Sequence, residues 1–334
     1  MKKLTLFLLA CLLLAACGQS YEETKQQTRR QRRASWRQDS AALKIAVMPT
    51  LDCLPLYVAR QERLLDTLYG GVRLKHYAAQ MDCDTALLRG RVEGMVTDLV
   101  RAKRIERGGM KLRYTAVTSA YWQLLSNRNS RIRQLRQLDD KMVAMTRYSV
   151  TDMLSDLVVD SAKLQHDRVF KVQVNDVGVR LQMLQNNELD ALWFTEPQAT
   201  QARLMKNPVV YDTRDGDQQL GILVFSEKEM QHQARSRQLD LLIKAYDRAC
   251  DLINERGVAY YRDLIVQHCM VKPQHVDSLP RTLKYQHARG PREQDLKRVD
   301  AWLDKVMPAK QAKRDEKPRN TRNNNKRKRR GNKR

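Results

Sequence analysis

The turn between a strand and a helix near the start of the chain carries two residues that could do chemistry. The stretch "KIAVMPTLDCLPLYVARQERLL" runs from Lys44 to Leu65 and places Asp52 and Cys53 just before the first turn of a helix. A thiolate is favoured at a helix N-terminus, so Cys53 could be a reactive thiol. Whether it reacts, binds a metal or forms a disulfide depends on what else the chain supplies.

The motifs of the common catalytic classes are missing from the sequence. The chain has no Ser-His-Asp order, no glycine-rich phosphate loop and no HExxH motif, and its six histidines are scattered. The segment "MDCD" at 81–84 could ligate a soft metal together with Cys53, but no histidine stands at a matching spacing. We therefore predict that the protein is not an enzyme and has neither a metal site nor a cofactor.

The first residues have the composition of an export signal. Lys2 and Lys3 precede the apolar run 4–14, which is too short to span a bilayer. The run ends in "LAAC", and small residues before a cysteine at this distance resemble a bacterial lipobox. The resemblance implies a signal peptide over 1–16 and lipidation of Cys17. The alternative is an ordinary secretory signal with a chance cysteine, and in both cases the mature chain leaves the cytoplasm.

The lipobox resemblance also implies a location. Gly18, rather than Asp, follows Cys17, which resembles sorting to the outer membrane. We expect a lipid-anchored protein of the cell envelope, on the outer or inner membrane and facing the periplasm or the surface. Nothing later in the sequence resembles a transmembrane span.

Two basic segments flank the middle of the chain. We read 17–42 as the lipidated cysteine followed by a flexible tether. The segment 309–334 holds 13 lysines and arginines against two acids, which gives it +11 of the chain's formal +24. It has no apolar residue larger than alanine, so we expect it to be disordered. Because the chain is exported, we expect the tail to meet anionic headgroups, lipopolysaccharide or other polyanions, or no dedicated partner, rather than nucleic acid.

The middle of the chain, 43–308, alternates short apolar strands with helices. Leu43–Met48 begins a β-α-β-α-β order, which favours a parallel, doubly wound sheet. A second cycle of this kind includes a strand at Lys141–Met145. The later part is helical, with one apolar stripe that should end near Gly257. The stripe consists of Leu239, Leu242, Ile243, Tyr246, Ala249 and Ile253.

Five segments together carry a family likeness. "LKIAVMPTLDCLPLYVARQERLL" resembles the opening of periplasmic substrate-binding proteins of the nitrate, sulfonate, taurine and thiamine-precursor branch. "DTALLRGRVEGMVTDL", "RIRQLRQLDDKMVAMTRYSVTDMLSDLV", "LQMLQNNELDALWFTEPQATQA" and the C-terminal helices resemble later parts of that family in the same order. The likeness covers nearly all of 43–306. Glycines of the family pattern are replaced at Arg63, at Asp140 and at Asn187 or Glu188.

The resemblance implies an α/β fold of type II periplasmic-binding-protein architecture. It implies two lobes, each a doubly wound sheet flanked by helices, with a ligand held between them. The expected divisions are 43–128 for the first part of lobe 1, 129–222 for lobe 2 and 223–308 for the return to lobe 1.

The same likeness implies a function. We expect a monomeric, lipid-anchored solute-binding protein that captures a small molecule for an ABC-type importer, with the permease as its partner. The alternative is a binding fold repurposed as an envelope or surface interaction protein through the basic tail.

Loops at the carboxyl ends of strands supply the candidate ligand-binding residues of such a cleft. They are Asp52, Tyr57, Asp82, Tyr121, Trp122, Arg147, Tyr148, Ser149, Thr151, Trp193 and Glu196. The aspartates, Ser149 and Thr151 could instead cap helices, and the two tryptophans could be core. The charge of the ligand stays open: Arg147 and helix N-termini favour an anion, and the acidic residues favour a cation or amine.

Four cysteines remain after processing: Cys53, Cys83, Cys250 and Cys269. An even number in an oxidising compartment suggests two disulfides. The implied fold favours pairing Cys53 with Cys83, on neighbouring loops, and Cys250 with Cys269, on consecutive helices. Cys250 also suits a small buried position on the apolar stripe.

Overall fold

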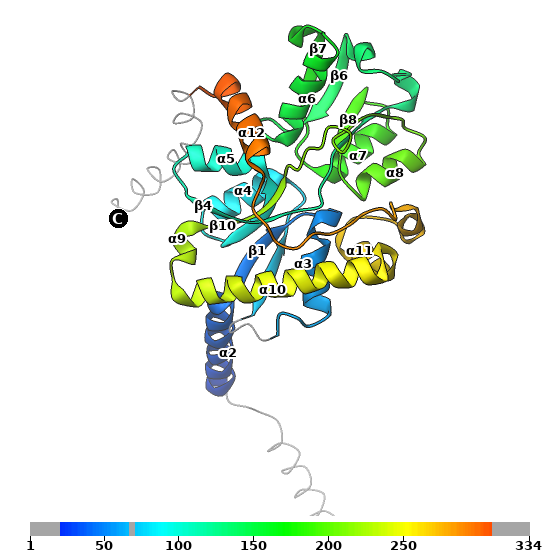
Figure 1. Cartoon of the computed structure of the whole chain (residues 1–334). Helices are drawn as coiled ribbons and strands as arrows, with labels where there is room; N and C mark the ends of the chain where they lie inside the picture. The colour runs from blue at the N-terminus through cyan, green and yellow to red at the C-terminus, as the bar shows by residue number, and fades with distance from the viewer. Residues whose placement is uncertain (1–20, 67–70, 309–334) are drawn as a thin grey trace, which may run out of the picture.

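Two five-stranded sheets organise the chain into two lobes (Figure 1). The computed structural model describes residues 21–66 and 71–308. The lobe 1 sheet has the order β2-β1-β3-β10-β4 and the lobe 2 sheet the order β7-β6-β8-β5-β9. The lobe 1 strands are β1 (Leu43–Val47), β2 (Val72–His76), β3 (Gly94–Asp98), β4 (Leu112–Val117) and β10 (Gly221–Ser226). The lobe 2 strands are β5 (Gln123–Ser126), β6 (Lys141–Met145), β7 (Val169–Gln173), β8 (Ala191–Phe194) and β9 (Val209–Asp212).

Both sheets are mixed, whereas the strand-helix alternation predicts parallel ones. In lobe 1, β1 pairs parallel with β2 and β3, but β10 runs antiparallel to β3 and β4. In lobe 2, β5 has the same role, antiparallel to β8 and β9. Each antiparallel strand follows a crossing from the other lobe, so it enters its sheet from the hinge side. The two-lobed fold is confirmed, with this change in strand direction.

The lobe boundaries also differ from the sequence-based ones. The apolar stretch from 112 to 126 supplies β4 to lobe 1 and β5 to lobe 2, so the chain crosses at 118–122, before the expected boundary at 128. It crosses back before β10, which starts at Gly221. Hydrophobicity alone does not separate two consecutive strands that are both buried, so the sequence does not show where the chain leaves lobe 1.

Helices cover the faces of both sheets. They are α3 (Leu54–Gln61), α4 (Gln80–Leu88), α5 (Leu99–Arg107), α6 (Val150–Ser161), α7 (Val177–Gln185), α8 (Gln198–Leu204), α9 (Glu227–Met230), α10 (Gln233–Arg256), α11 (Arg262–His268) and α12 (Glu293–Val306). Short 3-10 turns occur at Leu51–Cys53, Arg128–Ser130, Leu135–Leu138, His166–Arg168, Val258–Tyr261 and Pro273–Ser278. Most apolar residues of the strands are buried in one large core shared by helices and sheets.

The long helix α10 confirms the predicted apolar stripe. Leu242, Tyr246 and Ile253 are buried, and α10 packs against α3, which it crosses in Figure 1. The helix ends at Gly257, whose φ of 83° lies in a region that glycine adopts readily. None of the described helices combines the length and apolar character of a bilayer span.

The predicted flexible tether is helical for most of its length. Helix α2 spans Tyr21–Ala41 and leads into β1 (Figure 1). Its sequence has no proline or glycine and is rich in Gln, Arg and Glu, which are good helix formers. The amino-acid composition of this segment therefore favours a helix, whereas its high charge alone suggests a flexible tether. The predicted signal peptide, Cys17 and the basic tail lie outside the described residues.

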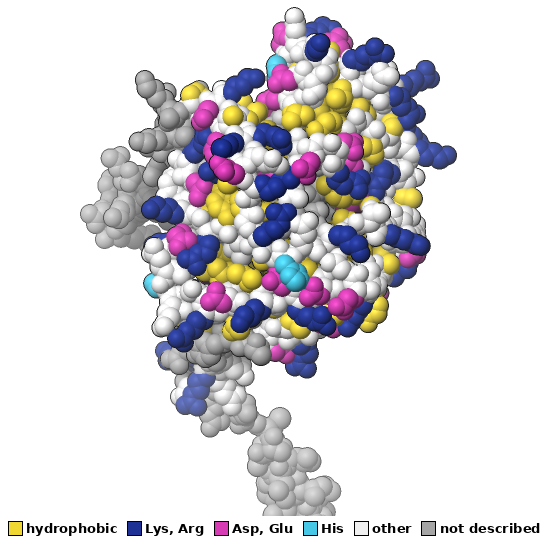
Figure 2. Space-filling model, in the orientation of Figure 1, with side chains coloured by type: hydrophobic (Ala, Val, Ile, Leu, Met, Phe, Trp, Pro, Cys, Tyr) yellow, Lys and Arg dark blue, Asp and Glu magenta, His cyan; other side chains and the backbone are white. Residues whose placement is uncertain are grey.

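Basic and acidic side chains are interspersed over most of the molecular face in Figure 2. The folded lobes carry many ion pairs, such as Arg107 with Asp300 and Arg113 with Glu227. The large positive charge of the whole chain is therefore no guide to the charge of a ligand in the cleft.

Candidate functional site

A cleft of about 90 Å³ lies between the lobes. Lobe 1 contributes the loop after β1, the end of β3 and the start of α5, and lobe 2 contributes the starts of α6 and α7. The carboxyl ends of parallel strands thus point at the cleft from both sides, as in other open α/β folds. The lobes touch beside it: Leu51 N donates to Glu196 O at 2.8 Å and Gln198 Nε2 to Pro49 O at 2.8 Å.

Arg101 is the buried cation of lobe 1. Its side chain is 1% exposed and its Nη1 donates to Asp84 Oδ2. Arg104 Nη2 donates to the same oxygen at 2.7 Å, and Asp98 Oδ2 lies 3.7 Å from Arg101 Nε. Nε and Nη2 of Arg101 are buried and make no hydrogen bond. Two carboxylates therefore neutralise Arg101, while its Nη2 has neither a hydrogen bond nor an ion pair among the described residues.

Arg180 on α7 is the buried cation of lobe 2, and its partners are all neutral. Its guanidinium donates to Trp193 O at 2.8 Å, Thr146 Oγ1 at 2.9 Å and Val174 O at 2.5 Å. Its Nε is buried without a partner, and within 21–66 and 71–308 no carboxylate forms an ion pair with Arg180. Burial, with the nearby positive charge of Arg101, lowers the pKa of Arg180 to about 10, and the negative charge of Asp176 opposes part of this shift. A buried cation without an acid partner favours an anion next to it.

Two carboxylates also line the cleft. Asp98 caps α5 by accepting a hydrogen bond from Arg101 N at 2.9 Å. Burial raises the pKa of Asp98 to about 6 and is partly offset by Arg101. Asp52 lies in the loop after β1, 3.5 Å from Thr118 Oγ1, and burial raises its pKa as well. Both carboxylates are thus easier to protonate than a solvated aspartate, and with a pKa of about 6 Asp98 still carries a negative charge at neutral pH.

Four of the sequence-predicted ligand-binding residues line this cleft. They are Asp52, Trp122, Ser149 and Thr151. Ser149 caps α6 by accepting a hydrogen bond from Thr151 N, and its Oγ donates to Thr146 O at 2.6 Å. Thr151 Oγ1 accepts from Thr146 N at 2.9 Å. The two hydroxyl groups therefore shape the start of α6 as well as facing the cleft.

The remaining predicted residues do not line the cleft. Tyr57 is buried, donates to Met48 O at 2.9 Å and stacks on His76 and His268. Trp193 is core and donates to Ser155 Oγ at 2.9 Å. Asp82 is exposed on α4, and Arg147 is exposed with its guanidinium over the Tyr148 ring.

Glu196 was the favoured strand-end residue, but its carboxylate is fully engaged. Oε1 accepts from Tyr121 Oη and Arg203 Nη2, both at 2.6 Å, and Oε2 accepts from Thr200 N and Oγ1. The side chain is 2% exposed. Glu196 and Tyr121 therefore form part of the hinge-side packing, next to the cleft rather than in it.

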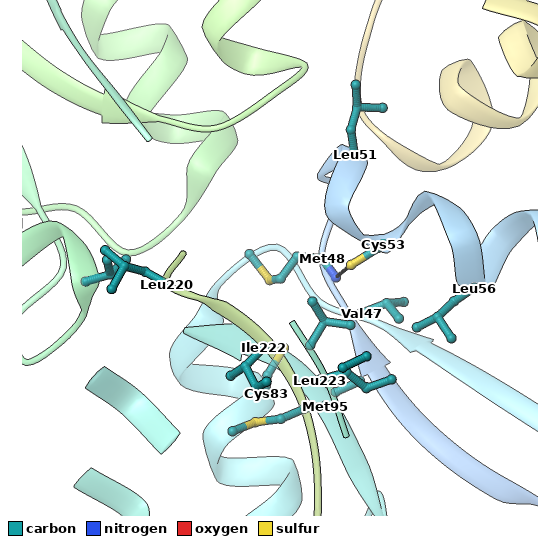
Figure 3. Close-up of a cluster of buried hydrophobic side chains, with 14 of the residues drawn as sticks. Val47, Met48, Leu51, Cys53, Leu56, Cys83, Met95, Leu220, Ile222 and Leu223 are labelled. Carbon is teal, nitrogen blue, oxygen red and sulfur yellow. Dashed lines mark hydrogen bonds between the residues drawn. The ribbon is translucent and has the colours of Figure 1, made fainter. Parts of the chain in front are cut away.

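The predicted disulfides are wrong, because all four cysteines are buried free thiols. In the strand order β2-β1-β3, the crossover from β1 to β2 and the one from β2 to β3 run in opposite directions. Right-handed crossovers then place α3 and α4 on opposite faces of the sheet. Figure 3 shows Cys53 and Cys83 separated by Val47 and Met48.

The atoms around the cysteine sulfurs are also those expected for free thiols. Cys53 Sγ accepts from Met48 N at 3.4 Å, and Cys269 Sγ lies 3.9 Å from Thr50 O. Cys250 is a small buried residue of the α10 stripe, which is the alternative role that the sequence left open. Burial raises the pKa of all four thiols, so Cys53 is not the reactive thiol that its place at a helix start suggested.

Sequence reasoning missed the two arginines and Asp98. Asp98 ends the quoted strand "GMVTD", and its position directly after a buried strand was a usable signal. Arg180 lies within the helix VGVRLQMLQ, where a single arginine between Val179 and Leu181 is expected on a solvated face. Only the packing of α7 against β8 turns it inward.

Comparison with known proteins supports the architecture. No protein-family model and no curated protein sequence matches the chain. Among solved structures, the alkanesulfonate-binding protein SsuA from Xanthomonas axonopodis pv. citri bound to MOPS has a TM-score of 0.68 at 17% identity, covering 81% of this chain and 94% of that one. The chain has the two-lobed fold of periplasmic solute-binding proteins.

Other solved periplasmic solute-binding proteins agree. The periplasmic aliphatic sulphonate binding protein SsuA from Escherichia coli has a TM-score of 0.66 at 16% identity, over 82% of this chain and 90% of its own. The periplasmic nitrate-binding protein NrtA from Synechocystis PCC 6803 has a TM-score of 0.63 at 13% identity, over 76% of this chain and 74% of its own. The family likeness expected from the sequence motifs thus holds at the level of the periplasmic-binding-protein fold.

Proposed function

We propose that the protein is a lipid-anchored solute-binding protein that holds a small anion between its lobes for an ABC-type importer. The observation that carries the proposal is Arg180. This guanidinium is buried, has only neutral partners and lines the cleft. An anion next to Arg180 would supply the missing negative charge, and it would accept hydrogen bonds from the unpartnered Nε.

The size and lining of the cleft support a small solute. A cleft of about 90 Å³ is well below the 300–1,000 Å³ typical of sites for drug-sized ligands. Thr97 Oγ1 and two guanidinium nitrogens of Arg101 are further buried donors without partners at the same cleft. A compact oxyanion with several acceptor atoms suits these donors. Solved proteins of this fold named for alkanesulfonate and nitrate binding are in keeping with this class of ligand.

The transport role and the anchor rest on the fold and on the N-terminal sequence. A lipidated Cys17 would tether the lobes to the envelope, and helix α2 would act as a spacer between lipid and lobe 1. The role is binding and delivery without chemical conversion. A permease would be the protein partner, and the tail at 309–334 would contact anionic surfaces.

A thermal-shift panel on the exported chain tests the proposal. We expect sulfate, nitrate and methanesulfonate, at constant ionic strength, to raise the melting temperature, and alkylammonium chlorides to have no effect. The Arg180→Met variant should lose the anion response, and Arg180→Lys should keep part of it. Arg147→Met, which removes an exposed arginine that does not line the cleft, is the matched control. A response to amines only would contradict the proposal, as would an unchanged anion response in Arg180→Met.

The same panel separates the alternative function. If the protein acts through its basic tail, a chain ending at residue 308 should lose salt-sensitive binding to polyanions, and no small solute should shift the melting temperature of either chain. That pair of results would replace the transport proposal.

A further inference from the structure

One oxygen of Asp98 joins the first turns of two helices that belong to different lobes. Oδ1 accepts from Arg101 N of α5 at 2.9 Å and from Val150 N of α6 at 3.2 Å. Asp98 is 5% exposed and Val150 2% exposed, so the contact is shielded from water. Capping α5 explains the first bond. It does not explain the second, which crosses the cleft to the opposite lobe.

The start of α6 has no further donor to offer. Val150 N is taken by Asp98, and Thr151 N donates to Ser149 Oγ at 3.2 Å. Asp152 N and Met153 N both donate to Ser149 O at 3.1 Å. The four backbone N–H groups that a helix N-terminus would present to an anion therefore have acceptors from the protein itself. The negative charge favoured at this helix end is supplied by Asp98.

We propose that Asp98 is a positioning residue that holds the lobes together through Val150 N–H and keeps a solute's negative group away from the start of α6. The solute's anionic group is then received by Arg180 and by Nη2 of Arg101, which makes no hydrogen bond. A second anion at α6 would lie against the Asp98 carboxylate, where like charges repel. The part that concerns the solute rests on the proposed function, whereas the part that concerns lobe closure rests on the hydrogen bond alone.

Two variants break the bond from opposite sides. Asp98→Ser keeps a side chain that caps α5 but is too short to reach Val150. Val150→Pro removes the donor and replaces a buried valine with another apolar residue, and proline is well tolerated at the first position of a helix. Ser149, which precedes it, has φ of −129° and ψ of 176°, a conformation compatible with a following proline. The double variant, with both substitutions, completes a double-mutant cycle. If Asp98 and Val150 share one hydrogen bond, the effects of the two single substitutions on lobe closure do not add.

Closure is measured by small-angle X-ray scattering of the exported chain in solute-free buffer. Each single variant should lower the ratio of closed to open molecules by about 10-fold, seen as a larger radius of gyration, because the lost bond is to a charged acceptor. The double variant should be no more open than either single one. Unchanged scattering in both single variants, or fully additive opening, would overturn the proposal, since a residue that only caps α5 would not couple to Val150.

Sulfate titration by calorimetry tests the specificity part. Both single variants open the lobes to the same extent, so they are compared with each other. We expect Asp98→Ser to bind sulfate about 10-fold more tightly than Val150→Pro, because only Asp98→Ser removes a negative charge from the cleft. Equal sulfate affinity in the two variants would overturn this part. If no variant binds any anion while the scattering effects are coupled, the proposed function fails and the closure by Asp98 stands.

Discussion

At the scale of single residues, the cleft is defined by an asymmetry between its two arginines. Asp84 and Asp98 neutralise Arg101, whereas Arg180 is held only by carbonyl and hydroxyl oxygens. Such an uncompensated charge costs folding free energy unless a ligand offsets it. An anion bound beside Arg180, as proposed, would offset this cost.

The pKa of Asp98 predicts how stability depends on pH. Burial raises this pKa to about 6 from 3.8 and Asp84 adds to the effect, while Arg101 and the backbone donors oppose it. The folded state thus holds the proton more tightly than the unfolded state, so the contribution of Asp98 to stability is largest below about pH 4 and is lost as the pH rises through about 6.

The Asp98→Asn variant isolates this effect, because asparagine has no proton to lose. In urea unfolding the two proteins should be about equally stable at pH 4, and the variant should become more stable at pH 8 by up to about 3 kcal/mol. A difference in unfolding free energy that stays constant between these pH values would contradict the buried position of Asp98.

The cysteines give a second prediction at this scale. Cys53, Cys83, Cys250 and Cys269 are buried free thiols, and burial raises the pKa of Cys250 to about 12. Native, never-reduced protein should therefore resist iodoacetamide at all four positions, and the same protein unfolded in urea should be labelled at all four. Peptide mass mapping reads both states. If cysteines of the unfolded protein were labelled only after a reductant is added, disulfides would be present and this prediction would be contradicted.

Particular residues show how far the sequence predicts the site. Asp52, Ser149 and Thr151 could be found because loops after strands face the cleft in this architecture. Glu196 stands at such a strand end too, but Tyr121 and Arg203 reach it from distant parts of the chain and occupy its carboxylate. Contacts of this kind depend on packing, which no local pattern encodes.

At the scale of elements, α12 clips the two lobes together. Lobe 1 holds this helix through ion pairs of Arg107 with Asp300 and Asp304 on the α5 side. One residue reaches across: Trp302 Nε1 donates to Asp156 Oδ2 of α6 at 2.8 Å. Asp156 is held in turn by Lys171 Nζ at 2.7 Å. Figure 1 shows α12 between α5 and α6.

Trp302→Phe should weaken this clip, because it keeps an aromatic ring and removes the donor. We expect a loss of about 1 kcal/mol in the closed state, since one partly exposed hydrogen bond to a carboxylate is removed. Scattering in solute-free buffer should show a larger radius of gyration. Asp304→Asn, which alters the same helix within lobe 1, is the control. Equal radii for the wild type and Trp302→Phe would show that α12 does not restrain the lobes.

The elements themselves were largely readable from the sequence. The α10 stripe, its end at Gly257 and the strand-helix alternation follow from local periodicity. The antiparallel strands β5 and β10 and the opposite faces of α3 and α4 follow from connections between lobes and between strands. Local periodicity does not reveal the order of strands in a sheet. The fold class could therefore be predicted from the sequence, whereas the disulfide pairing, which depends on that order, could not.

At the scale of the whole molecule, the chain crosses between the lobes twice. The segments at 118–122 and 213–220 and the contacts around Leu51 and Glu196 join the lobes on the hinge side. Gln198 and Gln201 of α8 also donate hydrogen bonds to Cys269 O and Met270 O of lobe 1. Asp98 and Trp302 join them at the cleft and at α12. A solute that binds Arg101 of lobe 1 and Arg180 of lobe 2 together would favour the closed state, as hinge-bending binders require.

The most direct test of the account is to locate the anion. Crystals of the protein grown with selenate, a heavy oxyanion, should show an anomalous diffraction peak in the cleft, within hydrogen-bond distance of the Arg180 guanidinium. Crystals of Arg180→Met grown in the same way should lack that peak. Selenate bound only elsewhere, or bound equally in the cleft of Arg180→Met, would contradict the claim that this cleft is an anion site built on Arg180.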